Sequence, residues 1–96
     1  MKIVFYVDKP QKPIVEQKIS QDPVGRQSIV VRDAVSLGIS KDGTYVYIDG
    51  TDESCNLARE WLKGLAAELS PKEAAEIIKK MEEQDASVSE GIGGMF

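Results

Sequence analysis

The hydrophobic pattern of this sequence changes near residue 50, and that change limits most strongly how the chain can fold. Before it, apolar residues come in short β-branched and aromatic runs, such as residues 3–7 and 44–48, which are typical of strands. After it, apolar residues recur at the three- and four-residue spacing of amphipathic helices. Strands that precede helices, rather than alternate with them, predict an α+β domain built on an antiparallel sheet.

The strand-rich half contains one hairpin signal and two ambiguous segments. Asp42-Gly43 lies between the alternating runs 36–40 and 44–48, and this dipeptide favours a two-residue hairpin turn. Residues 14–19 lie between prolines and are expected to form an edge strand or a loop. Residues 26–35 fit a helix or a strand by spacing, and their β-branched content favours the strand.

The hairpin signal also predicts a register. A two-residue turn at Asp42-Gly43 would place Ile39 opposite Val46 and Leu37 opposite Ile48, all on one face. A three-residue turn with a bulge at Gly43 would shift this pairing by one residue. We prefer the first register because it separates the apolar residues from the tyrosines.

The second half predicts two helices. Thr51 or Asp52 can cap a helix whose apolar stripe runs over residues 57–69. Residues 70–73, Ser-Pro-Lys-Glu, form a capping box with proline at the first helical position, so a second helix should begin there. The short joint predicts a helical hairpin or a sharp corner.

These elements predict one domain over residues 1–85, strand-rich in 1–50 and with two helices in 51–85. We expect an antiparallel sheet of about four strands, with the C-terminal pair of helices packed on one face. Residues 86–96 are rich in serine and glycine and are expected to form a flexible tail. A last strand or a docking segment is the alternative for this tail.

Composition narrows the classes of function. The 96 residues include no histidine and one cysteine, so the commonest general base, a thiolate zinc cage and a Cys-x-x-Cys redox pair are all absent. The net charge is −4, and residues 51–96 carry five Lys/Arg against ten Asp/Glu, which argues against broad attraction to nucleic acid or to an anionic membrane. We therefore expect a soluble cytoplasmic domain without a cofactor, and catalysis is the less favoured interpretation.

The turn from Asp49 to Cys55 is the candidate site for an enzyme or a divalent-cation-binding protein. Asp49, Asp52 and Glu53 supply the oxygen ligands that hard cations prefer, but acidic residues in a first helical turn are already explained by the helix dipole. Cys55 would gain thiolate character at a helix start, whereas the nearby carboxylates oppose this. Capping and a buried core cysteine are the preferred interpretations.

The preferred functional surface is a sheet face that carries tyrosines. Strand alternation places Tyr45 and Tyr47 on the side opposite Val46 and Ile48. The same alternation adds three residues to this surface: Tyr6, Lys2 and Arg32. If the helices cover the other face, we expect this one to be open and to bind a protein partner or a second copy of the chain. Stacking of single-stranded nucleic acid on the tyrosines is the second alternative.

Overall fold

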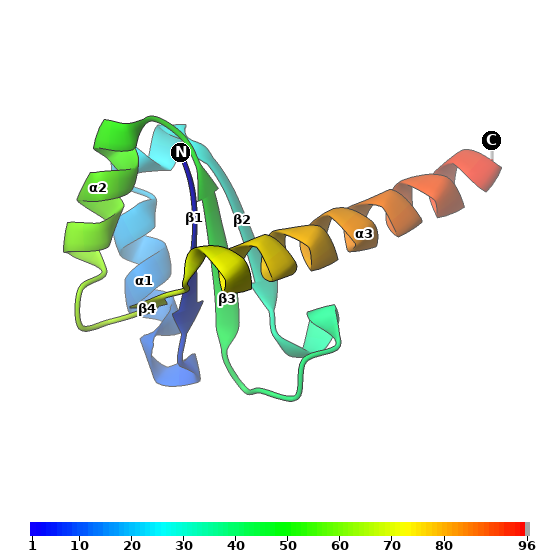
Figure 1. Ribbon diagram of the computed structural model, residues 1–96, viewed down its shortest axis with the longest axis horizontal. Coiled ribbons are helices and arrows are strands. Elements are labelled where there is room, and N and C mark those ends of the chain that lie inside the picture. The colour runs from blue at the N-terminus through cyan, green and yellow to red at the C-terminus, as the bar shows by residue number, and fades with distance from the viewer. Residues whose placement is uncertain (96) are drawn as a thin grey trace.

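The computed structural model describes the backbone of residues 1–95 and the side chains of residues 1–83 (Figure 1). Its elements, in chain order, are β1 (Lys2–Val7), η1 (Lys9–Gln11), α1 (Lys12–Ile19), η2 (Val24–Arg26), β2 (Ser28–Asp33), η3 (Val35–Leu37), β3 (Thr44–Asp49), α2 (Asp52–Trp61), β4 (Ala67–Glu68) and α3 (Pro71–Met95).

The four strands form one sheet in the order β2-β3-β1-β4, and every neighbouring pair is antiparallel. Helix α1 connects β1 to β2, and α2 connects β3 to β4, so two β-α-β units interleave in the split arrangement known as ferredoxin-like. Helix α3 is an addition at the C-terminal end. The expected fold class, an α+β domain on a four-stranded antiparallel sheet, is confirmed.

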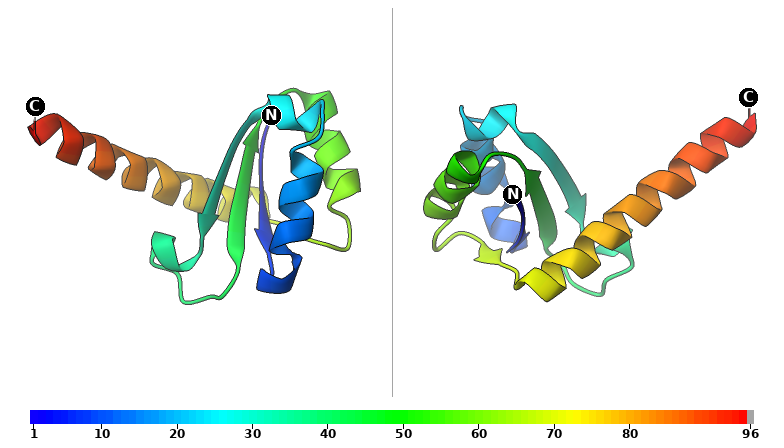
Figure 2. Two further views of the ribbon diagram at one scale, coloured as in Figure 1. Left: turned by 180° about the vertical axis from the view of Figure 1, so that it is seen from behind. Right: turned by 45° about the horizontal axis from the view of Figure 1, so that its top comes forward.

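Both faces of the sheet are covered by helices (Figure 2). On one face, α1 and α2 bury Ile3, Phe5, Val46 and Ile48. On the other face, the first turns of α3 bury a second cluster, which comprises Val4, Ala34, Leu37, Tyr45, Ala74, Ile77 and Met81. The two C-terminal helices therefore pack on the sheet as expected, but on opposite faces, because β1, β2 and β3 carry apolar residues on both sides.

The helix starts follow the capping signals. The Ser54 amide donates to the Thr51 side chain over 3.1 Å, and the Glu73 amide donates to the Ser70 side chain over 3.3 Å. The predicted stripe over 57–69 is wrong in its second half, since α2 ends at Trp61 and Gly64 adopts a left-handed φ of 81°. Strand β4 then separates α2 from α3, so these helices do not form a hairpin.

Residues 14–19 are not an edge strand or a loop, because they lie in α1. Pro13 falls in the first turn of this helix, where a missing amide hydrogen costs nothing. Val15 and Ile19 lie on one side of α1 and are buried in the core. The free energy gained by burying them outweighs the weak helix propensity of this segment. Most of the segment 26–35, in contrast, forms β2, as the β-branched content favoured.

The predicted hairpin register is wrong. Residues 35–37 form η3, and Gly38 closes this turn with a left-handed φ of 77°. Ile48 pairs with Ile29 and Val46 pairs with Val31, so β2 takes the place assigned to residues 36–40. The prediction that Val46 and Ile48 share one face, with the tyrosines on the other, is correct.

The backbone of α3 runs from Pro71 to Met95, and beyond the sheet it projects past β2 (Figures 1 and 2). The last strand considered as an alternative for the tail 86–96 is wrong over residues 86–95, because their backbone belongs to α3, and the flexibility predicted for this tail stays a prediction. Within the described residues, none of the helices is long and apolar enough to cross a membrane.

Candidate functional site

The five residues expected on one sheet face do lie together on the side of α3. Tyr6 pairs with Tyr45 across β1 and β3, and Arg32 pairs with Tyr45 from the other side. The rings of Tyr6 and Tyr45 lie 5.3 Å apart at 58°, a tilted aromatic pair. This face is not open, however, because α3 packs on it and leaves Tyr45 only 4% exposed.

Tyr6 is held by its neighbours rather than offered to a ligand. A Cβ at Gly43 would overlap the Tyr6 ring and hydroxyl, so the ring packs directly on glycine backbone. The Lys41 amine lies 5.0 Å from the centre of the same ring, within the range of a cation–π contact. Base stacking on Tyr6 would require this packing to open.

Tyr47 and Lys2 lie at the other end of the face. Burial raises the pKa of the Tyr47 phenol, the negative charge of Asp49 raises it further, and Lys2 offsets part of the effect. Tyr47 is half-buried beside α3. The phenol is therefore neutral and works as a packing residue with a polar tip.

The turn from Asp49 to Cys55 does not bring its acidic groups into one cluster. Within the described residues, no three carboxylates or cysteines lie close enough to hold a metal ion. Asp52 lies 3.8 Å from the N-terminal amine. Cys55 is fully buried, with its thiol 3.7 Å from the Met1 carbonyl, so the preferred interpretation of a core cysteine is correct.

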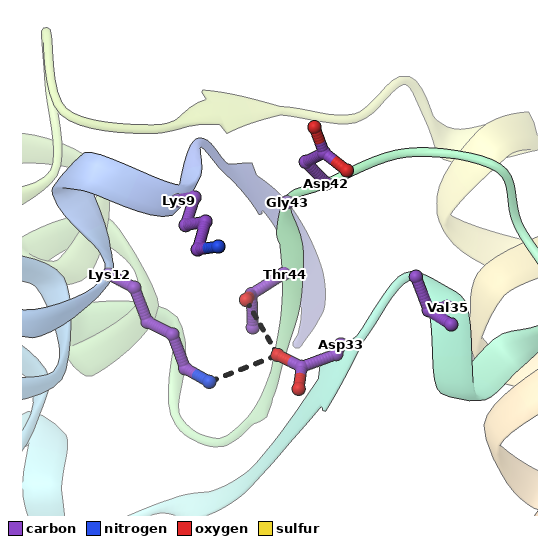
Figure 3. A pocket seen from close by; sticks show the side chains of 7 residues that line it. All are labelled: Lys9, Lys12, Asp33, Val35, Asp42, Gly43 and Thr44. Carbon is purple, nitrogen blue, oxygen red and sulfur yellow. Dashed lines mark hydrogen bonds and ion pairs between the residues drawn. The ribbon is translucent and has the colours of Figure 1, made fainter.

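A shallow pocket of about 280 Å³ lies where α1 meets the ends of β2 and β3 (Figure 3). Lys12 and Thr44 both donate to the same Asp33 oxygen, each over 3.0 Å. These bonds lower the pKa of Asp33, and the Asp33 bond raises the pKa of Lys12. Lys9 and Asp42 also line the pocket and carry opposite charges. The bonds to Asp33 join the end of β2 to α1 and to β3.

The outer edge of β2 lies at the end of the strand order, and within the described residues no strand pairs with it. Opposite residues in an antiparallel pair alternate between those that exchange hydrogen bonds and those that do not. The Ala34 amide donates to the Gly43 carbonyl over 2.9 Å, which fixes the phase of this alternation along β2. Val30 and Arg32 therefore bond to β3, whereas the backbone groups of Ile29 and Val31 point outward.

The outward groups lie among apolar side chains. Ile29 and Val31 are half-buried against the core under α1 and α2, and Val30 is half-buried on the side of α3. The Arg32 guanidinium donates to the outward Val31 carbonyl over 3.0 Å. Over residues 1–95, β2 ends the strand order, so its outer edge pairs with no strand.

Sequence reasoning did not find this edge. The run Ile29-Val30-Val31 was identified as apolar, but strand order depends on contacts between distant segments and cannot be obtained from a local pattern. A short apolar run, Ile29-Val30-Val31, followed directly by Arg32 and Asp33 is the signal that could have suggested it, because charged residues often protect edge strands.

Comparison of this chain with protein family models, with curated proteins and with solved structures finds no match.

Proposed function

We propose that this chain is a small non-catalytic protein-interaction domain that binds by strand addition at the edge of β2. The observation that carries the proposal is the outward backbone of Ile29 and Val31, which lies between apolar side chains on both faces. An unpaired edge of this kind is a template for another strand, since its amides and carbonyls gain partners while the flanking side chains gain cover.

This proposal moves the binding surface from the tyrosine face to the neighbouring edge. The tyrosines serve it indirectly, because Tyr45 packs with Ala74 and Ile77 and so holds α3 on the sheet. The expected partner remains a protein or a second copy, and no cofactor is needed. The single buried Cys55, which needs no oxidising environment, favours a cytoplasmic location.

The competing functions have less support from the geometry. Single-stranded nucleic acid would need exposed rings, whereas Tyr45 is buried and Tyr6 packs on Gly43. An enzyme or cation site at residues 49–55 would need convergent groups, which the described part of that turn does not bring together.

A capped octapeptide of alternating threonine and valine tests strand addition without assuming the natural partner. We expect millimolar peptide to shift the amide resonances of Ile29 and Val31 more than those of Phe5, in the middle of the sheet. The matched control is the same peptide N-methylated at alternate residues, which cannot donate along one edge. Equal shifts with both peptides, or none with either at a protein concentration at which the chain is monomeric, would contradict the proposal.

A further inference from the structure

We propose that the strand added to β2 is β2 of a second copy of this chain, related by a two-fold axis at Val30. This inference rests on the proposed function, and it names the partner. Residues 28–33 are complementary to themselves when two copies run antiparallel.

Of the antiparallel registers related by a two-fold axis, only the one centred on Val30 places apolar residues opposite apolar residues and polar residues opposite polar residues. With the axis at Val30, Ile29 lies opposite Val31 of the second copy, and Val30 lies opposite Val30. Ser28 then lies opposite Arg32, at the polar ends of the pairing. With the axis one residue later, Asp33 would lie opposite Ile29 and Arg32 opposite Val30, which pairs charged with apolar side chains. Cross-strand pairs of like character stabilise a sheet, so the Val30 register is favoured.

The alternation of inward and outward backbone groups along β2 agrees with this register. Its hydrogen-bonded pairs are Ile29 with Val31 of the second copy, and these are the two residues whose amides and carbonyls point outward. The Val31 carbonyl already accepts from Arg32, but a carbonyl oxygen has two lone pairs and can accept the second bond as well. The two four-stranded sheets would become one continuous sheet.

Opposed residues in a sheet share a face, so the two-fold axis is perpendicular to the joined sheet and the two α3 helices lie on the same side. In each copy, α3 crosses the sheet and continues past β2, toward the place of the second copy (Figures 1 and 2). The strand pairing alone is shorter than a standard protein interface, so the expected dimer is weak and depends on concentration.

The first test measures self-association by sedimentation equilibrium, with circular dichroism to confirm folding. The Val30→Lys variant places two ammonium groups opposite each other at the axis, and we expect it to weaken dimerisation at least tenfold. The control is Ile14→Lys, which adds the same charge at an exposed position of α1 and should leave dimerisation unchanged. A wild-type dimer unaffected by Val30→Lys would overturn the inference.

The second test identifies the register even if the lysine variant folds poorly. Residues opposed at Val30 form a non-hydrogen-bonded pair, with Cα atoms about 4.5 Å apart, which a disulfide can span. Oxidised glutathione should therefore crosslink the Val30→Cys variant into a covalent dimer. Wild type, whose Cys55 is buried, and the exposed control Val35→Cys should remain uncrosslinked. Equal crosslinking of the two cysteine variants would contradict this register.

The outcomes separate this inference from the proposed function. A protein that remains monomeric at about 1 mM but binds the threonine–valine peptide accepts a strand from a different partner, so only the inference fails. A monomer that also ignores the peptide overturns both. A crosslinked Val30→Cys dimer that dissociates on reduction and dilution supports both.

Discussion

The two edges of the sheet differ in length, in composition and in how they are closed. Strand β4 contributes only Ala67 and Glu68, and Arg59 of α2 holds Glu68 through two bonds of 2.8 Å. Strand β2 contributes six residues, with outward backbone at Ile29 and Val31. Short, charged edges resist pairing, whereas longer apolar edges favour it.

The molecule thus closes the β4 edge of its sheet and leaves the β2 edge available for pairing. Both faces of the sheet already have helices, so neither face offers the extended surface that the sequence first indicated. The central strands β1 and β3 stabilise the fold, whereas the edge strands are the surfaces at which another strand could bind.

The paired residues Ile48 and Ile29 compare the centre of the sheet with its open edge. Ile48 is fully buried in β3, and we expect Ile48→Ala to cost about 2–5 kcal/mol of unfolding free energy. Ile29 is half-buried, so Ile29→Ala should cost about 1 kcal/mol. Urea unfolding at low protein concentration measures both. Equal costs would place Ile29 in the core rather than at an edge.

A pair of proline variants tests which backbone groups of β2 face outward. Val30→Pro removes an amide that bonds to Tyr47, whereas Val31→Pro removes one that points away from the sheet. We expect Val30→Pro to be less stable than Val31→Pro by about 1–3 kcal/mol, the cost of an unsatisfied buried partner. Thermal unfolding compares them directly. The reverse order would mean that the assigned phase of the ladder is wrong.

Removing the ion pair between Arg59 and Glu68 tests its role at the β4 edge. Arg59→Ala loses the two bonds to Glu68, and because this pair is partly exposed we expect a loss of about 0.2–1 kcal/mol. The control is Arg26→Ala, which removes a more exposed pair with Asp22 and should cost less. Self-association of Arg59→Ala, measured by light scattering, should match wild type unless the β4 edge is the one that pairs.

The smallest effect concerns the end of β2. The Lys12 and Thr44 bonds lower the pKa of Asp33 below its ordinary value of 3.8, so the charged form is favoured in the folded state. The resulting stability is present above that ordinary value and is lost as pH falls through the lowered pKa. Between pH 6 and pH 2, the melting temperature of wild type should therefore fall more than that of Asp33→Asn. Parallel curves would show that this pair contributes nothing.

Features of the sequence that depend on neighbouring residues could be predicted. The capping residues Thr51 and Ser70 mark both helix starts, because a capping side chain acts on an amide two or three residues away. The alternation of β3 was also correct, so the faces of Tyr45 and Tyr47 followed from the sequence. The fold class depends on the same local signals.

The remaining features depend on contacts between distant segments. Residues 14–19 form a helix because Val15 and Ile19 find a core under the sheet. The strand β4 has two residues, too few for a pattern, and it exists because the Leu69 amide reaches the Val4 carbonyl at 2.9 Å. The covering of the tyrosine face follows from the path of α3. For the candidate site, the strand β2 could be predicted from the sequence, but its position at the edge of the sheet could not.

Amide hydrogen exchange of Ile29 and Val31, measured residue by residue at increasing protein concentration, would show whether β2 pairs with β2 of a second copy. At about 10 μM both amides should exchange quickly, as expected for outward groups, while the inward amide of Val30 stays protected. At about 1 mM we expect Ile29 and Val31 to become protected together, while the outward amide of Glu68 at the β4 edge is unchanged. Fast exchange of both amides at every concentration would contradict pairing of β2 with a second copy.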